Sequence, residues 1–156
     1  MVFVRSIGSV RSLRRFSSSG PLIQTGDVLR ENRVFSDEDV RAYSKVSHDT
    51  NPLHFDSEHA RALGFEDRLV HGMLVASLFP RIISSNFPGA VYVSQSLQFK
   101  LPVYVGEEIT GEVQATNIRK LRDKSFVKLA TKCFKKGELL VIDGEALAIL
   151  PSLARE

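Results

Sequence analysis

A carboxylate and an imidazole stand close together in the most polar stretch of the chain. Asp49 is separated from His54 only by Thr50-Asn51-Pro52-Leu53. A carboxylate and an imidazole held side by side can act as general acid and general base, and each such group typically contributes about 10²–10⁴-fold to a rate. Pro52 imposes a turn between them, because it disfavours the α conformation at Asn51. This turn allows both side chains to reach one water or hydroxyl, but it does not require them to.

Each residue of the pair also has a purely structural interpretation. Asp49 alone is typical of a turn or helix end, and His54 alone is typical of a hydrogen-bonded loop histidine. With Asp56 and His59 nearby, a metal site is a further alternative. No two of these residues occupy positions i and i+4 on one helix face, the spacing that zinc-binding helices use, so we expect no metal ion.

Three segments resemble the signature of the MaoC-like, (R)-specific enoyl-thioester hydratase family. In the first segment, the residues in register with the family are Asp49, Asn51, Pro52, Leu53, His54 and Ala60. Residues 69–74, Leu-Val-His-Gly-Met-Leu, resemble the opening of the family's central helix, and residues 94–107 resemble its central strand and following turn. The resemblance covers about residues 20–150. It departs at His48, where the family has glycine, and at Pro80, where several relatives have serine.

The resemblance implies an α+β hot-dog fold, with an antiparallel sheet wrapped around a long central helix. It implies reversible dehydration of (3R)-hydroxyacyl thioesters to trans-2-enoyl thioesters, which needs no cofactor because there is no net redox change. Asp49 and His54 are then the catalytic pair. The N–H of Gly72, unpaired at a helix start, is expected to hold the thioester oxygen. Asn51, His71 and Met73 are expected to orient the site or contact the substrate.

The periodicity of the sequence predicts the elements around this site. Ser36 is expected to cap a helix through His48, with Val40, Tyr43 and Val46 on its apolar face. A short helix is expected at 57–63, and a buried central helix at 72–85 that is kinked or ended by Pro80. Strands are expected at 91–105, with Val91 and Val93 on the apolar face, and at 109–118, 125–134 and 139–150. The connectors 105–108, 121–124 and 135–138 predict antiparallel neighbours.

The first 20 residues differ in composition from the rest. They contain Arg5, Arg11, Arg14, Arg15 and many serines but no acidic residue, which is typical of a mitochondrial or plastid presequence. A disordered basic arm is the alternative. We expect residues 1–16 to be a mitochondrial presequence and 17–156 a single domain. This predicted presequence favours fatty-acid synthesis on acyl carrier protein in the mitochondrial matrix. The absence of a peroxisomal Ser-Lys-Leu signal from the C-terminal residues favours the same pathway.

The composition excludes several other classes. The net charge of +3 comes from the N-terminal arginines, so the rest of the chain is close to neutral, which argues against a nucleic-acid partner. No apolar run approaches the ~18 residues of a membrane span. The single cysteine, Cys133, has no partner for an internal disulfide.

Partners and rival functions remain open at this stage. The thioester substrate is expected on acyl carrier protein or coenzyme A, and hot-dog domains usually pair, so a homodimer is expected. Lys128 and Lys132 are either solvated lysines or part of a docking patch for an acidic carrier. The rival functions are a hot-dog thioesterase and a non-catalytic acyl-binding subunit.

Overall fold

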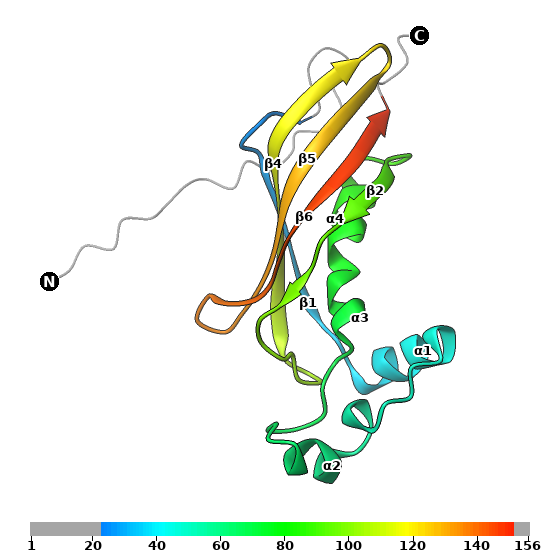
Figure 1. Cartoon of the computed structure of the whole chain (residues 1–156), viewed down its shortest axis with the longest axis vertical. Coiled ribbons are helices and arrows are strands. Elements are labelled where there is room, and N and C mark those ends of the chain that lie inside the picture. The colour runs from blue at the N-terminus through cyan, green and yellow to red at the C-terminus, as the bar shows by residue number, and fades with distance from the viewer. Residues whose placement is uncertain (1–22, 152–156) are drawn as a thin grey trace, which may run out of the picture.

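Residues 23–151 are the part of the chain that the computed structural model describes, and they form an antiparallel sheet packed against helices (Figure 1). The sheet has six strands in the order β1-β4-β5-β6-β2, and β3 also pairs with β6. The strands are β1 (Val28–Val34), β2 (Val91–Gln95), β3 (Gln98–Phe99), β4 (Glu108–Leu121), β5 (Lys124–Lys135) and β6 (Leu139–Pro151). The helices are α1 (Asp37–Ser47), the 3₁₀ helix η1 (Pro52–His54), α2 (Ser57–Ala62), α3 (Gly72–Ala76) and α4 (Leu78–Asn86). The predicted α+β arrangement is confirmed.

The three long strands β4, β5 and β6 form the centre of the sheet. They are joined by two tight hairpins, at Arg122-Asp123 and at 136–138, and all their pairings are antiparallel, as predicted. Along β5 the inward side chains, which include Leu129 and Cys133, are buried, whereas Lys128 faces solvent. Cys133 is fully buried, and burial raises the pKa of its thiol to about 12, because the thiolate loses its hydration.

The predicted central helix is present but is divided in two. Helix α3 ends at Ala76 and α4 begins at Leu78. Pro80 explains the position of the break, because a proline lacks an N–H and its ring crowds the carbonyl four residues earlier, here that of Ala76. Helix α4 then lies close to the sheet at Gly111, where a β-carbon would come within 3.3 Å of the Leu78 side chain. No helix in the described range is long and apolar enough to cross a membrane.

The strand expected at 91–105 was only partly right. It is interrupted after Gln95 and after Phe99, and a bulge between Tyr92 and Ser94 reverses which side chains face inward. Val91 and Val93 are therefore half-exposed on the outer face of the edge strand β2, and not buried as predicted. The connector 105–108 also does not join paired neighbours, because β4 pairs with β1 and β5.

Two features at the start of the domain differ from the expectation. Strand β1 was not predicted, because its exposed residues Arg30, Asn32 and Arg33 give it the polarity of a loop. Helix α1 was predicted, and Ser36 caps it as expected, in a capping box that it forms with Asp39. Its inward face, however, runs through Val40 and Ser44, and Val46 is 83% exposed.

Candidate active site

The loop that carries Asp49 begins with an unusual backbone conformation. Helix α1 ends at Ser47, and His48 then takes the left-handed conformation with φ 59° and ψ 16°. Its N–H still bonds the carbonyl of Ser44. Left-handed backbone favours glycine, since a β-carbon there costs roughly 1–2 kcal/mol. The position where this chain departs from the family's glycine is therefore the position where glycine would be least strained.

The backbone of Asp49 is held from two sides. Its carbonyl oxygen accepts a hydrogen bond of 2.7 Å from the Ser44 hydroxyl and one of 3.1 Å from Nε2 of His71. Its carboxylate oxygen Oδ1 accepts the N–H of Asn51 at 3.2 Å, which closes the turn. This bond fixes the direction of the carboxylate, although the residue as a whole is exposed.

Asn51 and Leu69 fix the position of His54. The side-chain oxygen of Asn51 caps η1 by accepting the N–H of Leu53 at 3.2 Å, and His54 is the last residue of that short helix. Nδ1 of the buried His54 lies 2.7 Å from the carbonyl oxygen of Leu69. A carbonyl can only accept, so Nδ1 carries the proton. In the neutral ring, Nε2 is then free to take a proton.

His71 supports both members of the pair. It is 2% exposed, and its ring stacks on that of His54 with 3.6 Å between centroids. Burial lowers the pKa of His71, because the charged imidazolium would lose its hydration. His71 is therefore neutral near pH 7, with Nε2–H on the Asp49 carbonyl, and Nδ1 has no hydrogen-bond partner among residues 23–151.

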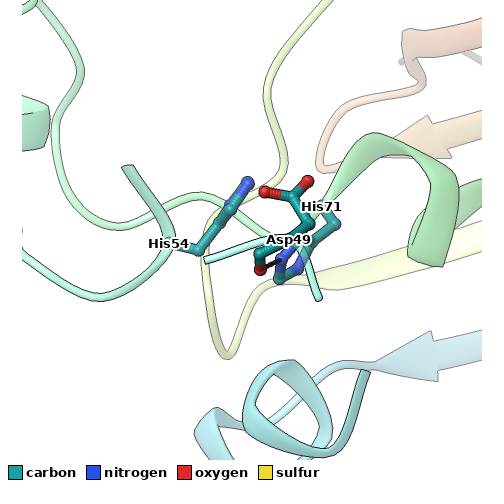
Figure 2. A group of neighbouring side chains, drawn as sticks. All are labelled: Asp49, His54 and His71. Atoms are coloured by element: carbon teal, nitrogen blue, oxygen red, sulfur yellow. Dashed lines mark hydrogen bonds between the residues drawn. The ribbon is translucent and has the colours of Figure 1, made fainter. Parts of the chain in front are cut away.

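The structure brings the predicted pair together and adds His71 to it. A carboxylate oxygen of Asp49 and one ring nitrogen each of His54 and His71 all lie within 4.8 Å of one another. Figure 2 shows the carboxylate and a ring nitrogen of His54 pointing toward each other, with His71 below. The same three groups are close enough to offer one ligand atom each to a metal ion, so the expectation of no metal stays a prediction.

A pocket of about 520 Å³ opens beside this group. Asp49, His54, His71 and Gly72 contribute to its wall, and most of the other lining side chains are apolar. The remaining lining residues are Tyr43, Phe65, Leu69, Val70, Met73, Val75, Phe99, Lys100, Leu101, Pro102, Val103, Val141 and Ile142. Such a pocket, with a few polar groups at one end, suits an acyl chain that carries one reactive head.

Gly72 and Met73 lie at the start of α3, as predicted, and both line the pocket. The ring of Phe99 covers Gly72 so closely that a β-carbon there would meet it at 2.8 Å. Met73 is 57% exposed. Only glycine fits at position 72 without moving the aromatic ring, and both Met73 and Phe99 expose apolar surface near the pocket.

Lys128 and Lys132 do not line this pocket. In the sheet register Lys132 lies between Glu112 and Asp143 on the adjacent strands, so its charge is locally balanced. Lys128 has the uncharged neighbours Asn117 and Leu147. It lies nearer the β4–β5 hairpin, which is at the opposite end of the long axis from α1 and α2 (Figure 1).

Sequence reasoning missed three contributors to the site. Ser44 had a weak signal, because it lies one turn after Val40 on α1 and shares its buried face. The sequence pattern argued against a site role for Phe99, since the alternation predicted its side chain to be buried in the core and not to line a pocket. No feature of the sequence points to the Leu69 carbonyl, because every residue has a backbone carbonyl whatever its side chain.

Several known proteins match this chain. The family described as the MaoC like domain matches residues 20–135. A mitochondrial 3-hydroxyacyl-[acyl-carrier-protein] dehydratase of Arabidopsis thaliana is 67% identical over 144 residues, which are 90% of this chain and 87% of that protein. A second mitochondrial dehydratase of that name, from Solanum lycopersicum, is 56% identical over 156 residues, covering 100% of this chain and 94% of its own length. Among solved structures, the (R)-hydratase from A. caviae involved in PHA biosynthesis superposes with a TM-score of 0.77 at 40% identity, over 83% of this chain and 98% of that one.

Proposed function

The chain belongs to the MaoC-like family and has its hot-dog fold, and on that premise we propose that it interconverts (3R)-hydroxyacyl and trans-2-enoyl thioesters in the mitochondrial matrix. The mitochondrial relatives act, by name, on acyl carrier protein, so an acyl-carrier thioester is the proposed substrate. The observation that carries the proposal is the meeting of Asp49 and His54 in the wall of a mostly apolar pocket.

In the proposed chemistry, Asp49 and His54 act as general base and general acid. In the hydration direction, water adds its oxygen to Cβ of the enoyl group and gives up a proton, while Cα gains one. Nε2 of neutral His54 and the Asp49 carboxylate can accept the first proton and return one to Cα. Because one proton is taken and one is given, the pair ends in its starting protonation state. Dehydration is the same sequence reversed.

We further propose that the Gly72 N–H holds the thioester oxygen. Negative charge builds on this oxygen as Cα changes its protonation, and a fixed donor stabilises that charge. Two observations support the role: Gly72 begins α3, where N–H groups lack helical partners, and it lines the pocket beside the pair. Asn51 and His71 are then positioning residues for His54 and Asp49, and Met73 is a substrate contact.

A homodimer is the proposed assembly. Strand β2 is at the edge of the sheet, and such a strand presents unpaired backbone groups to another chain. Its half-exposed Val91 and Val93 add apolar surface at this edge. Light scattering tests the proposal. The full chain should show twice its monomer mass, and the Val93→Glu variant should shift toward the monomer; a wild-type monomer would contradict it.

The presequence proposal concerns residues 1–16, which lie outside the described range. Its support is the arginine-rich, acid-free composition together with the mitochondrial names of the relatives.

Docking of the acidic carrier protein is proposed for Lys128 and Lys132. Charge reversal of Lys128 should raise KM for an acyl-carrier substrate but not for the coenzyme A thioester. If the variant and the wild type had the same KM for the acyl-carrier substrate, docking at Lys128 would be contradicted.

The decisive experiment follows two signals at once on the purified full chain. With (3R)-hydroxyacyl or trans-2-enoyl thioesters, enoyl absorbance reports hydration and a thiol reagent reports hydrolysis. Enoyl interconversion without free thiol is the expected result. Release of free thiol would instead identify a thioesterase. If neither the enoyl absorbance nor the free thiol changed, acyl binding would remain as the function.

A further inference from the structure

Lys135 is a buried cation outside the catalytic group. It is the last residue of β5, and its side chain is only 10% exposed. Its ammonium donates a hydrogen bond of 2.7 Å to the carbonyl oxygen of Pro102 and lies 3.3 Å from the carboxylate of Glu107. It also lies 5.2 Å from the centre of the Tyr104 ring, within the range of a cation–π contact. An ammonium with three partners is a structural anchor, not a solvated surface charge.

All three partners of Lys135 belong to one short segment, residues 102–107. Its start forms part of the pocket wall, because Pro102 and Val103 both line the pocket. Glu107 is tied to the same segment, since its carboxylate also accepts the N–H of Tyr104 at 3.0 Å. Lys135 therefore fastens one wall of the pocket to the end of the central strand β5.

This wall in turn holds the carbonyl that orients His54. Tyr104 and Leu69 form an isolated antiparallel bridge. On either side of it, the N–H of Val70 bonds the carbonyl of Val103 at 2.8 Å, and the N–H of Val105 bonds the carbonyl of Arg68 at 3.1 Å. The carbonyl of Leu69 is the acceptor for Nδ1–H of His54.

We propose that Lys135 is a positioning residue that sets the tautomer and direction of His54 through this bridge. The inference rests on the proposed function, because it assigns His54 its catalytic role. The coupling is contiguous: the ammonium holds Pro102 and Tyr104, Tyr104 is bridged to Leu69, and Leu69 accepts from the imidazole. Without the ammonium, Glu107 loses its cation and the wall loses its link to β5. The Leu69 carbonyl can then move relative to Nδ1.

The test compares Lys135→Met with Lys136→Met in the full chain. Met keeps most of the length of lysine and removes only the charge and the donors. Lys136 is the adjacent residue and is exposed, so its variant controls for the loss of one positive charge. Lys135→Gln is a milder second variant that removes the charge but keeps an N–H₂ donor group, and it is the variant to measure should the Met variant fail to fold.

Two measurements separate positioning from simple stability. Imidazole ¹⁵N NMR reports which ring nitrogen of His54 carries the proton, and enoyl hydration reports kcat and KM. We expect the Lys135 variants to lose the Nδ1–H tautomer and to lower kcat about tenfold, since small misplacements of catalytic groups have effects of this order or larger. The Lys136 variant should match the wild type in both measurements.

Two results would overturn the inference. One is a Lys135 variant with a lower melting temperature but the wild-type tautomer and kcat. The other is a lower kcat with the tautomer unchanged. If the wild type itself does not hydrate enoyl thioesters, the proposed function fails, and the tautomer comparison still decides whether Lys135 controls His54.

Discussion

The loop of residues 47–54, which carries Asp49 and His54, and the central strands β4–β6 are held in place by different forces. The loop depends on individual polar contacts, such as those of the Ser44 hydroxyl and the Asn51 side chain, and it contains a left-handed residue. The strands depend on a continuous backbone ladder and on burial of apolar side chains against α4. Removal of a loop side chain that makes a polar contact should therefore alter activity more than stability, and truncation of a core side chain should do the reverse.

The largest effect is expected for Asp49→Asn. The amide oxygen can still accept the N–H of Asn51, so the turn should persist, but the proposed general acid–base group is lost. We expect kcat to fall about 10²–10⁴-fold, with a melting temperature close to that of the wild type. The matched control is Asp56→Asn, which changes a carboxylate that caps α2 and does not line the pocket. Equal activity of the two variants would remove Asp49 from the mechanism.

Phe79→Ala tests the hydrophobic core, where we expect stability to change and activity to be kept. Phe79 is fully buried on α4 and does not line the pocket. Truncating a buried phenylalanine typically costs about 3–5 kcal/mol. Urea unfolding should show this loss, whereas kcat per folded molecule at low temperature should change little. A loss of kcat comparable to that of Asp49→Asn would show that core and loop are not separable.

Ser44→Ala should change both stability and activity, because Ser44 belongs to α1 but donates to the carbonyl of Asp49 in the loop. The variant leaves the Asp49 carbonyl with His71 as its remaining donor. We expect a loss of about 1–3 kcal/mol in the free energy of unfolding and a lower kcat. Ser84→Ala, which removes a hydroxyl bonded within the exposed face of α4, is the control. An unchanged kcat would mean that His71 alone fixes Asp49.

His71 should make stability depend on pH. Its pKa in the folded chain is lowered from 6.5 by burial. Above the unfolded pKa both states are neutral and its contribution is fully present. As pH falls below 6.5 the unfolded chain takes up a proton that the folded chain resists, so the free energy of unfolding decreases. Unfolding curves between pH 5 and 7.5 should show this slope, and His71→Gln should reduce it.

The smallest effect is expected for His48→Gly, and it should be stabilising. Glycine removes the cost of left-handed backbone but adds freedom to the unfolded chain, which leaves roughly 0.5–1 kcal/mol of gain. Activity should be unchanged. A loss of stability would show that the His48 side chain makes a contribution that outweighs its strain.

The sequence predicted what depends on local rules. The capping box of Ser36 and Asp39, the turn at Pro52 and the hairpins between β4, β5 and β6 all follow from residue type and spacing. Asp49 and His54 were found through a motif, and the structure does bring them together.

The errors occurred at the sheet edges, where tertiary contacts decide. In 91–105 the alternation placed Val91, Val93 and Gln95 on one inward face, with Gln95 as its polar member. The bulge puts the two valines out of this phase, whereas Gln95 does reach the interior, where it donates to the buried Thr131 hydroxyl at 2.8 Å. Its carbonyl oxygen accepts the Tyr92 hydroxyl. A polar residue that interrupts an apolar face can thus mark a change of phase.

The burial of Cys133 also matters for spectroscopy. It is the chain's single cysteine, it is fully enclosed in the sheet, and its thiol has a pKa of about 12. The thiolate is the nucleophile that attacks a maleimide, so the native enzyme should not react with maleimides at neutral pH. A cysteine introduced at an exposed position, such as Met73, could then carry a single fluorophore without background labelling, which would allow substrate entry to be followed directly.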